Sequence, residues 1–385
     1  MPPTDAERRA WADAGLLDTD ASEEPDRLAL LEYLTARGAT IEQMVEAHAI
    51  GNLPGVASDL VIERNAPTAT VRDVAASADV PIQTVLRALL AAGVPAEPDT
   101  EVPAELTGFL DAFKEGAALM GDEAILAFIR VLGAAATNIA EGAVALFFTE
   151  LGPGSVREGP NELARAQIAE AATTAFTRVP DVVAGLVQVA FERASHRVQV
   201  AHPYQQGPAA TDPDWADGPA EVVALGFVDL VGSTAWAQSI TLREQNLALT
   251  RFESAAWSSA VLAGGRVVKM IGDEVFFAAP TSEAACRIAV EVCAAVGADH
   301  VLPPARGAVG IGPVTPREGD YFGPLVNLLA RLVKVGGPGE VVATEAVAQD
   351  LDPTSWTLTP LAPADVRGVD HPVPVFHVEH RGPGQ

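Results

Sequence analysis

The hydrophobic periodicity of this chain changes at a segment rich in proline, glycine and aspartate, QQGPAATDPDWADGPA at residues 205–220. Before this segment, apolar residues recur at three- and four-residue steps, as in RLALLEYLTARG (27–38) and TIEQMVEAHAIG (40–51), which is typical of amphipathic helices. After it, short apolar runs typical of buried strands alternate with helical patterns. A chain of 385 residues is long for a single hydrophobic core. Together with the change of pattern, this length predicts two domains joined by a linker.

The segments are expected to differ in character. Residues 1–25 are predicted to be a flexible acidic tail, 26–204 an all-helical regulatory or dimerisation domain, 205–220 a linker, and 221–385 an α+β domain whose antiparallel-rich sheet is flanked by helices. In the second domain, RVVKMI and EVFFAA are expected to form a hairpin that turns at Gly272-Asp273. No repeat of 20–50 residues is visible in the sequence.

The overall charge limits the partners of the chain. It carries 25 Lys and Arg residues against 51 Asp and Glu residues, a formal net charge of −26. Such a field repels nucleic acid and anionic membranes. A phosphate ligand would therefore need local cations or a bound metal ion.

The two cysteines indicate the cellular compartment. Cys286 and Cys293 are seven residues apart on one predicted helix, where geometry forbids a disulfide between them. Two free thiols suit a reducing cytoplasm. The N-terminus lacks the apolar core of a signal peptide. The most hydrophobic stretch, residues 124–151, is interrupted by Arg130 and Glu141. No stretch is expected to reach the ~20 apolar residues of a membrane span, so we expect a soluble cytoplasmic protein without a transmembrane segment.

Two features of the helical half have open interpretations. The run from Val131 to Phe148 is apolar on most faces, which predicts either a buried central helix or a groove for an apolar partner such as a fatty acid. Residues 70–93 resemble a helix-turn-helix that would direct Gln83, Thr84 and Arg87 toward bases. Because its second helix offers only Arg87 as a cation and the whole chain is strongly acidic, this segment is interpreted mainly as a packing hairpin.

Two aspartates stand at the ends of apolar segments in the second half. Asp229 in FVDLVGST (227–234) ends a predicted strand, and Asp273 in KMIGDEVFF (269–277) lies at the hairpin tip. Either aspartate alone is ordinary turn chemistry. If the two strands are neighbours, however, the carboxylates could share one or two Mg²⁺ ions. The backbone N–H groups that follow Asp229 could hold phosphate oxygens at a helix start; these belong to Leu230, Val231, Gly232, Ser233 and Thr234.

Three motifs in order carry a resemblance to a known family. FVDLVGST, KMIGDEVFFA and REGDYFGPLVNLLARL (317–332) resemble the catalytic domain of class III nucleotide cyclases, which has a ferredoxin-like, palm-type fold. GVDHPVPVFHV (368–378) resembles the end of that domain. The resemblance covers residues 221–379. The helical half resembles the N-terminal regulatory domains of some actinobacterial adenylyl cyclases.

The resemblance implies a role for each matching position. Asp229 and Asp273 would hold two Mg²⁺ or Mn²⁺ ions. Lys269 and Asp320 would read adenine, because an ammonium donates to a ring nitrogen and a carboxylate accepts from the exocyclic amine, so ATP is the expected substrate. Asn327 and Arg331, at i and i+4 of one helix, would orient the ribose and stabilise phosphate charge. Arg306 would contact phosphates, or would be an ordinary arginine at a strand start.

The resemblance also implies a reaction and an assembly. The ribose 3′-oxygen would attack the α-phosphorus, releasing pyrophosphate and closing cyclic AMP, in sites shared between the two catalytic domains of a homodimer. The aspartates Asp229 and Asp273 and the base-reading Lys269 would come from one protomer, and its partner would supply Asp320, Asn327 and Arg331. Leu329 stands where a small residue is more usual, which could alter dimer packing without removing a catalytic group.

Regulation and alternative functions remain open at this stage. The helical domain is expected to restrain the cyclase halves in response to a fatty acid, or to protons through His196 and His202. One alternative is a catalytically weak or silent sensor, or a DNA-binding regulator using residues 70–93. A diguanylate cyclase is disfavoured, because Ile271 precedes Gly272 where that family has a second glycine.

Overall fold

The structure, a computed structural model, describes residues 3–17, 24–65, 68–151, 161–201, 221–369 and 371–381. The chain divides into two compact units, Met1–Val200 and Ala201–Gln385. Each unit is described by itself. The expected linker, 205–220, lies outside the described residues.

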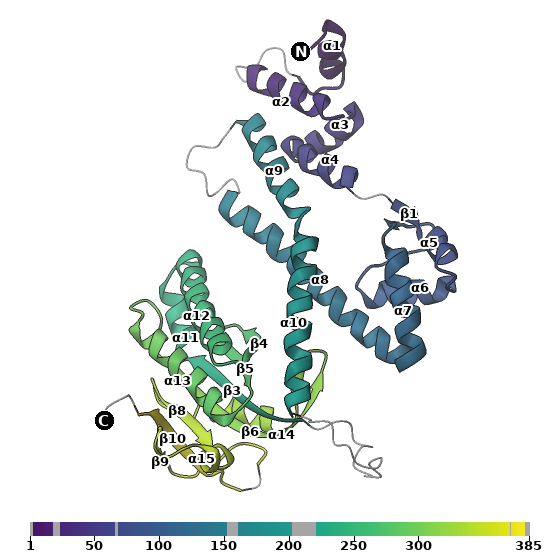
Figure 1. The fold of residues 1–385 in the computed structure, drawn as a ribbon. Helices are drawn as coiled ribbons and strands as arrows, with labels where there is room; N and C mark the ends of the chain where they lie inside the picture. The colour runs from purple at the N-terminus through teal and green to yellow at the C-terminus, as the bar shows by residue number, and fades with distance from the viewer. Residues whose placement is uncertain are drawn as a thin grey trace. The chain divides into compact units, whose positions relative to one another are not determined.

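The first unit is built mainly of helices (Figure 1). They are α1 (Asp5–Asp13), α2 (Glu24–Ala36), α3 (Ile41–Ala49), the 3₁₀ turn η1 (Leu53–Gly55), α4 (Val56–Asn65), α5 (Val71–Ser77), α6 (Ile82–Ala91), α7 (Leu106–Met120), α8 (Asp122–Leu151), α9 (Glu162–Phe176) and α10 (Val179–Ala201). Two short strands, β1 (Thr68–Thr70) and β2 (Glu101–Pro103), pair antiparallel. This small sheet corrects the expectation of an all-helical domain.

The N-terminal segment was expected to be a flexible tail, and the described part of it is folded instead. Thr4 and Glu7 form a capping box that starts α1. Trp11 of this helix is only 2% exposed, and it belongs to the same buried cluster as Leu30 and Met44. The apolar ring of Trp11 fixes α1 to the unit, so the prediction for residues 1–25 was wrong for this helix.

The helix-turn-helix geometry expected at residues 70–93 is present as α5 and α6, which are bent by 116° relative to each other. The pair shares a buried cluster with Val102 of β2 and Leu110 of α7. Arg87, the cation of the second helix, forms an ion pair with Glu123. A DNA phosphate would have to displace this carboxylate.

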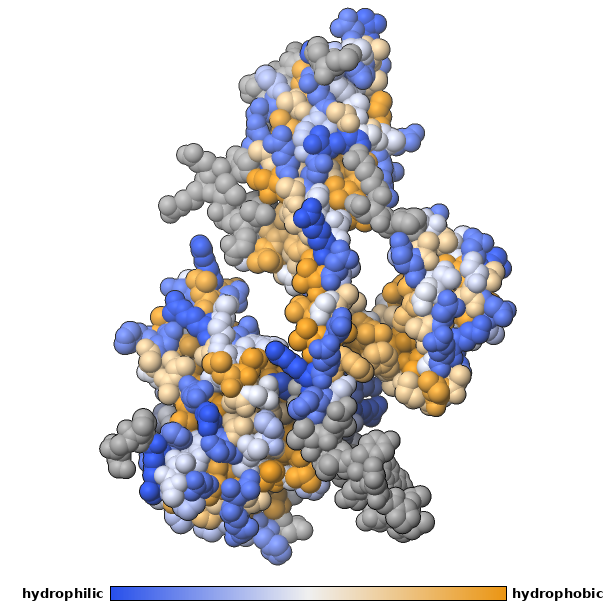
Figure 2. Space-filling model, in the orientation of Figure 1, coloured by the Kyte–Doolittle hydropathy of each residue, from blue (hydrophilic) through white to orange (hydrophobic). Residues whose placement is uncertain are grey.

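Helix α8 is not the buried central helix that was one expectation. Ile125, Leu126 and Ile129 are buried, but the apolar side chains farther along are largely exposed: Leu132, Ile139, Val144 and Leu146. Apolar residues of α10 are also exposed, and orange side chains of both helices reach the surface in Figure 2. The stretch Asp122–Phe147 is long and apolar enough to cross a membrane, by length and composition alone. Most of its apolar part is not buried within the chain. The expectation that no stretch reaches that length was therefore wrong.

The second unit is a sheet covered by helices on both faces (Figure 1). Its elements are β3 (Glu221–Leu230), α11 (Ser233–Ser239), α12 (Leu242–Leu262), β4 (Arg266–Ile271), β5 (Glu274–Ala279), α13 (Ser282–Ala298), β6 (Ala305–Arg317), β7 (Asp320–Phe322), α14 (Pro324–Leu332), β8 (Val341–Thr344), α15 (Glu345–Asp350), β9 (Trp356–Pro360) and β10 (Val375–His380). The strand order is β4-β5-β3-β6-β8-β10-β9, with β7 paired to β6. Only the β6–β8 pair is parallel among these described strands, as expected for an antiparallel-rich sheet.

Two local features shape this unit. Two helices connect β3 to β4, because Ile240 is extended and a capping box of Thr241 and Glu244 starts α12. Strand β6 is long, and it pairs with β7 up to Arg317.

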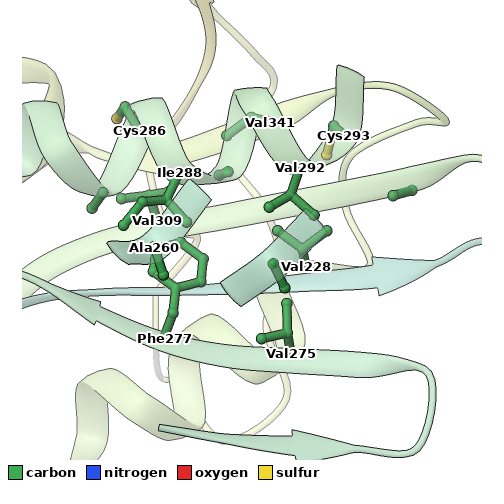
Figure 3. Close-up of a cluster of buried hydrophobic side chains, with 14 of the residues drawn as sticks. Val228, Ala260, Val275, Phe277, Cys286, Ile288, Val292, Cys293, Val309 and Val341 are labelled. Atoms are coloured by element: carbon green, nitrogen blue, oxygen red, sulfur yellow. The ribbon is translucent and has the colours of Figure 1, made fainter. Parts of the chain in front are cut away.

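The sheet separates two hydrophobic cores because side chains alternate along each strand. Ala224 and Val228 of β3 belong to the core under α12 and α13, whereas Leu225 and Phe227 belong to the core under α14. Figure 3 shows the first core, in which Val292 of α13 approaches the sheet. The face under α14 is the one that carries the charged residues described below.

Both cysteines lie in the first core. Cys286 and Cys293 are buried and free on α13, well apart along the helix in Figure 3, which confirms the prediction of two unbridged thiols. Burial raises the pKa of each thiol to about 12, so both stay protonated and unreactive at neutral pH.

Leu329 has a packing role within the chain. Its side chain is fully buried in the core under α14, where it packs against Gly310 of β6. A Cβ atom on Gly310 would lie 2.9 Å from a methyl carbon of Leu329. The bulk of Leu329 thus fills the space that a glycine leaves open, and its effect on dimer packing stays a prediction.

We expect Gly310→Ala to destabilise the chain by about 1–3 kcal/mol, because a well-packed core cannot accept another carbon without strain. The matched control is Gly312→Ala on the same strand, whose added Cβ would meet Leu325 at an ordinary 3.5 Å. In Gly310→Ala/Leu329→Ala the loss should be smaller than the sum of the single losses. Urea unfolding curves measure all four variants, and additive losses would refute this packing account.

Candidate active site

Three ionisable residues form a row across neighbouring strands. Asp229 of β3 lies opposite Glu274 of β5 on one side and opposite Arg306 of β6 on the other. Because directly opposed residues share a face of the sheet, all three project on the side of α14. The sequence condition for a shared carboxylate site, that the strands of Asp229 and Asp273 be neighbours, is met.

The two aspartate motifs are joined through their backbones. Gly272 has φ +65° at the tip of the β4–β5 hairpin, a conformation that favours glycine. Just beyond it, the carbonyl of Asp273 accepts a hydrogen bond from the backbone N–H of Leu230 at 3.2 Å. The end of β3 and the hairpin tip are therefore in direct contact.

Arg306 binds the carboxylate of Asp229. Its Nε and Nη2 donate to the same Oδ2 atom at 3.1 and 2.8 Å, and its Nη1 donates to the carbonyl of Lys334 at 3.2 Å. Asp229 is 8% exposed, so this charge-assisted pair compensates a nearly buried carboxylate. Arg306 thus links the residues after α14 to the end of β3, and its expected contact with phosphate remains a prediction.

Glu274 is a site residue that sequence reasoning missed. Its Oε1 is buried and has no hydrogen-bond partner among the described residues. Burial, and after it the negative charges of Asp229 and Asp273, raise the pKa of Glu274 to about 7, while the positive charges of Lys334 and Arg306 oppose this shift. Glutamate after Asp273 was visible in the sequence, but only the strand register shows that it faces Asp229.

The carboxylates at the ends of β3 and β5 have oxygen donors of the kind that a divalent cation binds. In the part of the chain that the structure describes, no three His, Cys, Asp or Glu residues gather closely enough to hold a metal ion by themselves. Asp229, Asp273 and the unbonded Oε1 of Glu274 nevertheless supply the hard oxygen donors that Mg²⁺ and Mn²⁺ prefer. The set suits a cation whose coordination is completed by oxygen atoms of a phosphate ligand.

The predicted row of phosphate-binding amides is shorter than expected. The N–H groups of Leu230 and Val231 already donate to the carbonyls of Asp273 and Pro304. Gly232, with φ +73°, caps α11, and Ser233 and Thr234 form its first turn, where N–H groups have no intrahelical acceptor. The N–H groups of Leu230 and Val231 are therefore already occupied, which corrects the expectation that they bind phosphate oxygens.

Lys269 and Asp320, the expected base-reading pair, contact each other within one chain. Lys269 Nζ forms an ion pair with Asp320 Oδ2, and the side chains are 45% and 22% exposed. Arg266 of β4 brings the two together, since it donates to the carbonyl of Gly319 in the β6–β7 turn at 3.0 Å. This contact within one chain differs from the expectation that one protomer supplies Lys269 and its partner supplies Asp320.

Asn327 and Arg331 both lie on an exposed face of α14. Arg331 Nη1 donates to the carbonyl of Arg367. In the described part of a single chain, neither side chain has a hydrogen bond or ion pair to Asp229 or Asp273. The two sets of expected catalytic residues are thus present but not joined by direct contact.

Comparison with known proteins gives an uncharacterized relative and relatives named as adenylate cyclases. No family model matches the chain. It is 31% identical over 358 residues to the uncharacterized protein Rv2212 of Mycobacterium tuberculosis (strain H37Rv), covering 92% of this chain and 90% of the relative. It is 36% identical over 146 residues to an adenylate cyclase of Glutamicibacter nicotianae, covering 38% and 36%. It is 24% identical over 373 residues to the pH-sensitive adenylate cyclase MT1302 of M. tuberculosis (strain CDC 1551), covering 94% and 90%.

Cyclase domains are among the solved structures that resemble part of the chain. The catalytic core of a rhodopsin-guanylyl cyclase with converted specificity, in complex with ATPalphaS, matches with a TM-score of 0.39 and 19% identity over 42% of this chain and 97% of that one. The adenylyl cyclase CyaB from P. aeruginosa matches with a TM-score of 0.38 and 17% identity over 43% and 97%.

We predict that Arg306→Met lowers the free energy of unfolding by about 3 kcal/mol or more, because it leaves the nearly buried Asp229 carboxylate uncompensated. The matched control is Arg287→Met, which removes an exposed i,i+4 pair with Glu283 and should cost less than about 1 kcal/mol. Adding Asp229→Asn to Arg306→Met should recover part of the loss. Urea unfolding in the presence of a chelator measures these differences, and equal losses for the two arginine variants would contradict the role of Arg306.

Proposed function

The chain belongs to the class III nucleotide cyclase family, and from this premise we propose that it is a cytoplasmic enzyme that converts ATP to 3′,5′-cyclic AMP and pyrophosphate. The observation that carries the proposal is the joining of the two aspartate motifs through Leu230 and Asp273 at the ends of neighbouring strands. The adenylate cyclase relatives support the same activity.

Adenine recognition is assigned to Lys269 and Asp320. Lys269 donates to a ring nitrogen and Asp320 accepts from the exocyclic amine, an arrangement that disfavours guanine, which presents an oxygen and a protonated nitrogen at those places. Since the two side chains are paired with each other in one chain, the base has to enter between them. One protomer therefore supplies both base contacts of a site.

The reacting groups are assigned to the ends of β3 and β5. Asp229 and Asp273 would hold the Mg²⁺ or Mn²⁺ ions, with Glu274 beside them. When bound, the ions supply Lewis acidity that lowers the pKa of the ribose 3′-hydroxyl and offsets the charge of the triphosphate. In the reaction the bond from the 3′-oxygen to the α-phosphorus forms, the bond to the departing pyrophosphate breaks, and the hydroxyl proton is released.

Asn327 and Arg331 complete the proposed machinery. Asn327 orients the ribose, and Arg331 stabilises the negative charge that develops around the α-phosphorus. Because neither contacts Asp229 or Asp273 within one chain, we infer that a second copy supplies them and that the active form is a homodimer with shared sites.

The first unit is proposed to regulate this dimer. Its exposed apolar side chains on α8 and α10 support either association of two copies or binding of a fatty acid or similar apolar ligand. A proton input would use His196, which is exposed on α10, whereas His202 lies outside the described residues. The alternative of a DNA-binding regulator is disfavoured by the ion pair of Arg87 with Glu123.

The first test is the reaction itself. The full chain with Mn²⁺ should form cyclic AMP from ATP and little cyclic GMP from GTP, as measured by mass spectrometry. Asp273→Ala should lose activity by about 100-fold or more, since it removes a proposed metal ligand. Asp350→Ala, at the exposed end of α15, serves as the control and should keep wild-type activity. Cyclic AMP formation that persists in Asp273→Ala would refute the metal assignment.

The second test asks which residues share a protomer. Co-expression of Asp273→Ala with Arg331→Ala should restore about a quarter of the wild-type activity, because half of randomly paired dimers contain one intact site of two. Co-expression of Lys269→Ala with Asp320→Ala should restore nothing, because each site of a mixed dimer then contains one defect. Restoration by the second combination would show that the base contacts come from different protomers.

A further inference from the structure

A short segment after β9 is anchored against α14. Ala364 exchanges two backbone hydrogen bonds of 2.9 Å with Val373. Val366 is buried in the core that also contains Leu329 and Leu332 of α14. The N–H of Val369 donates to the carbonyl of Val366 at 3.0 Å, which closes a turn. Residues 364–369, the anchored segment, are thus attached to the same core as the helix beside them.

The anchored segment holds the side chain of Arg331. Its contribution is the main-chain carbonyl of Arg367, which accepts a hydrogen bond from Arg331 Nη1. A carbonyl is uncharged, so it fixes the position of a guanidinium without neutralising it, whereas Arg306 is paired with the carboxylate of Asp229. In the described residues Arg331 has no ion pair with a carboxylate. Its positive charge and its remaining N–H donors stay available to an anion.

Gly368 makes this contact possible in two ways. Its φ of +79° belongs to the left-handed region, where residues with a side chain are strained. A Cβ atom at this position would also lie 3.2 Å from Arg331 Nη1, closer than ordinary van der Waals contact. The chain can therefore pass this close to the guanidinium only because residue 368 has no side chain.

From this arrangement we propose that the anchored segment positions Arg331 for catalysis, with Gly368 as the positioning residue and the Arg367 carbonyl as the fixed acceptor. The inference rests on the proposed function, because it assumes that Arg331 acts on the α-phosphate. A guanidinium held in place before the substrate binds loses less freedom when charge develops, which favours the transition state over the bound substrate.

The test is Gly368→Ala in the full chain. We expect kcat to fall by about tenfold with KM for ATP changed less than twofold, because the added methyl displaces a group that acts in the transition state. The matched control is Gly264→Ala, which has a similar φ of +76° but whose Cβ would meet only Pro280 at an ordinary 3.9 Å. The control reproduces the backbone strain without the contact to Arg331, so it should keep the wild-type kcat.

A second measurement does not depend on activity. The NMR signal of the Arg331 Nε–Hε group, assigned by its loss in Arg331→Lys, should shift or broaden in Gly368→Ala and stay unchanged in Gly264→Ala. An unchanged Arg331 signal, or equal kcat values for the two alanine variants, would overturn the inference. An inactive wild-type chain would refute the proposed function, and the NMR comparison would still decide whether the segment positions Arg331.

Discussion

The second unit depends on the burial of strand β3 on both faces and both edges. Strands β5 and β6 pair with β3, so every residue along it has a fixed neighbour. Gly226 shows how tight this arrangement is, because a Cβ there would fall 2.2 Å from the ring of Phe277. A strand held in this way cannot slip in register, since a shift of one residue would exchange its two cores. The charged residue at its end is therefore held as firmly as the apolar ones.

The charges of the site follow from this constraint. Asp229 lies between an acidic and a cationic side chain, with Glu274 on one side and Arg306 on the other. Arg306 compensates the carboxylate of Asp229, whereas Glu274, whose pKa is raised mainly by burial, keeps an oxygen without a hydrogen-bond partner among the described residues. In a chain of net charge −26, the proposed binding of ATP would require cations placed individually within the unit. Arg331, held by a carbonyl instead of a carboxylate, is one of these cations.

Much of the second unit could be predicted from local sequence. The hairpin strands RVVKMI and EVFFAA occur at the expected residues, because alternating apolar positions and a Gly-Asp turn are short-range features. The free state of the cysteines followed from their spacing. An expectation failed where a residue meets a partner far along the chain, as Trp11 does in its cluster. Periodicity describes one element and contains no information on what covers it.

The amino-acid sequence by itself determined which chemical groups are present and in what order. Three sequence motifs contain all six expected site residues: Asp229, Lys269, Asp273, Asp320, Asn327 and Arg331. Only the tertiary structure decided how these groups combine, because strand register and turn contacts join residues that are distant in the chain. Register placed Glu274 opposite Asp229, the β6–β7 turn brought Asp320 to Lys269, and the anchored segment brought a carbonyl to Arg331. Such contacts depend on the packing of whole elements, which no single motif encodes.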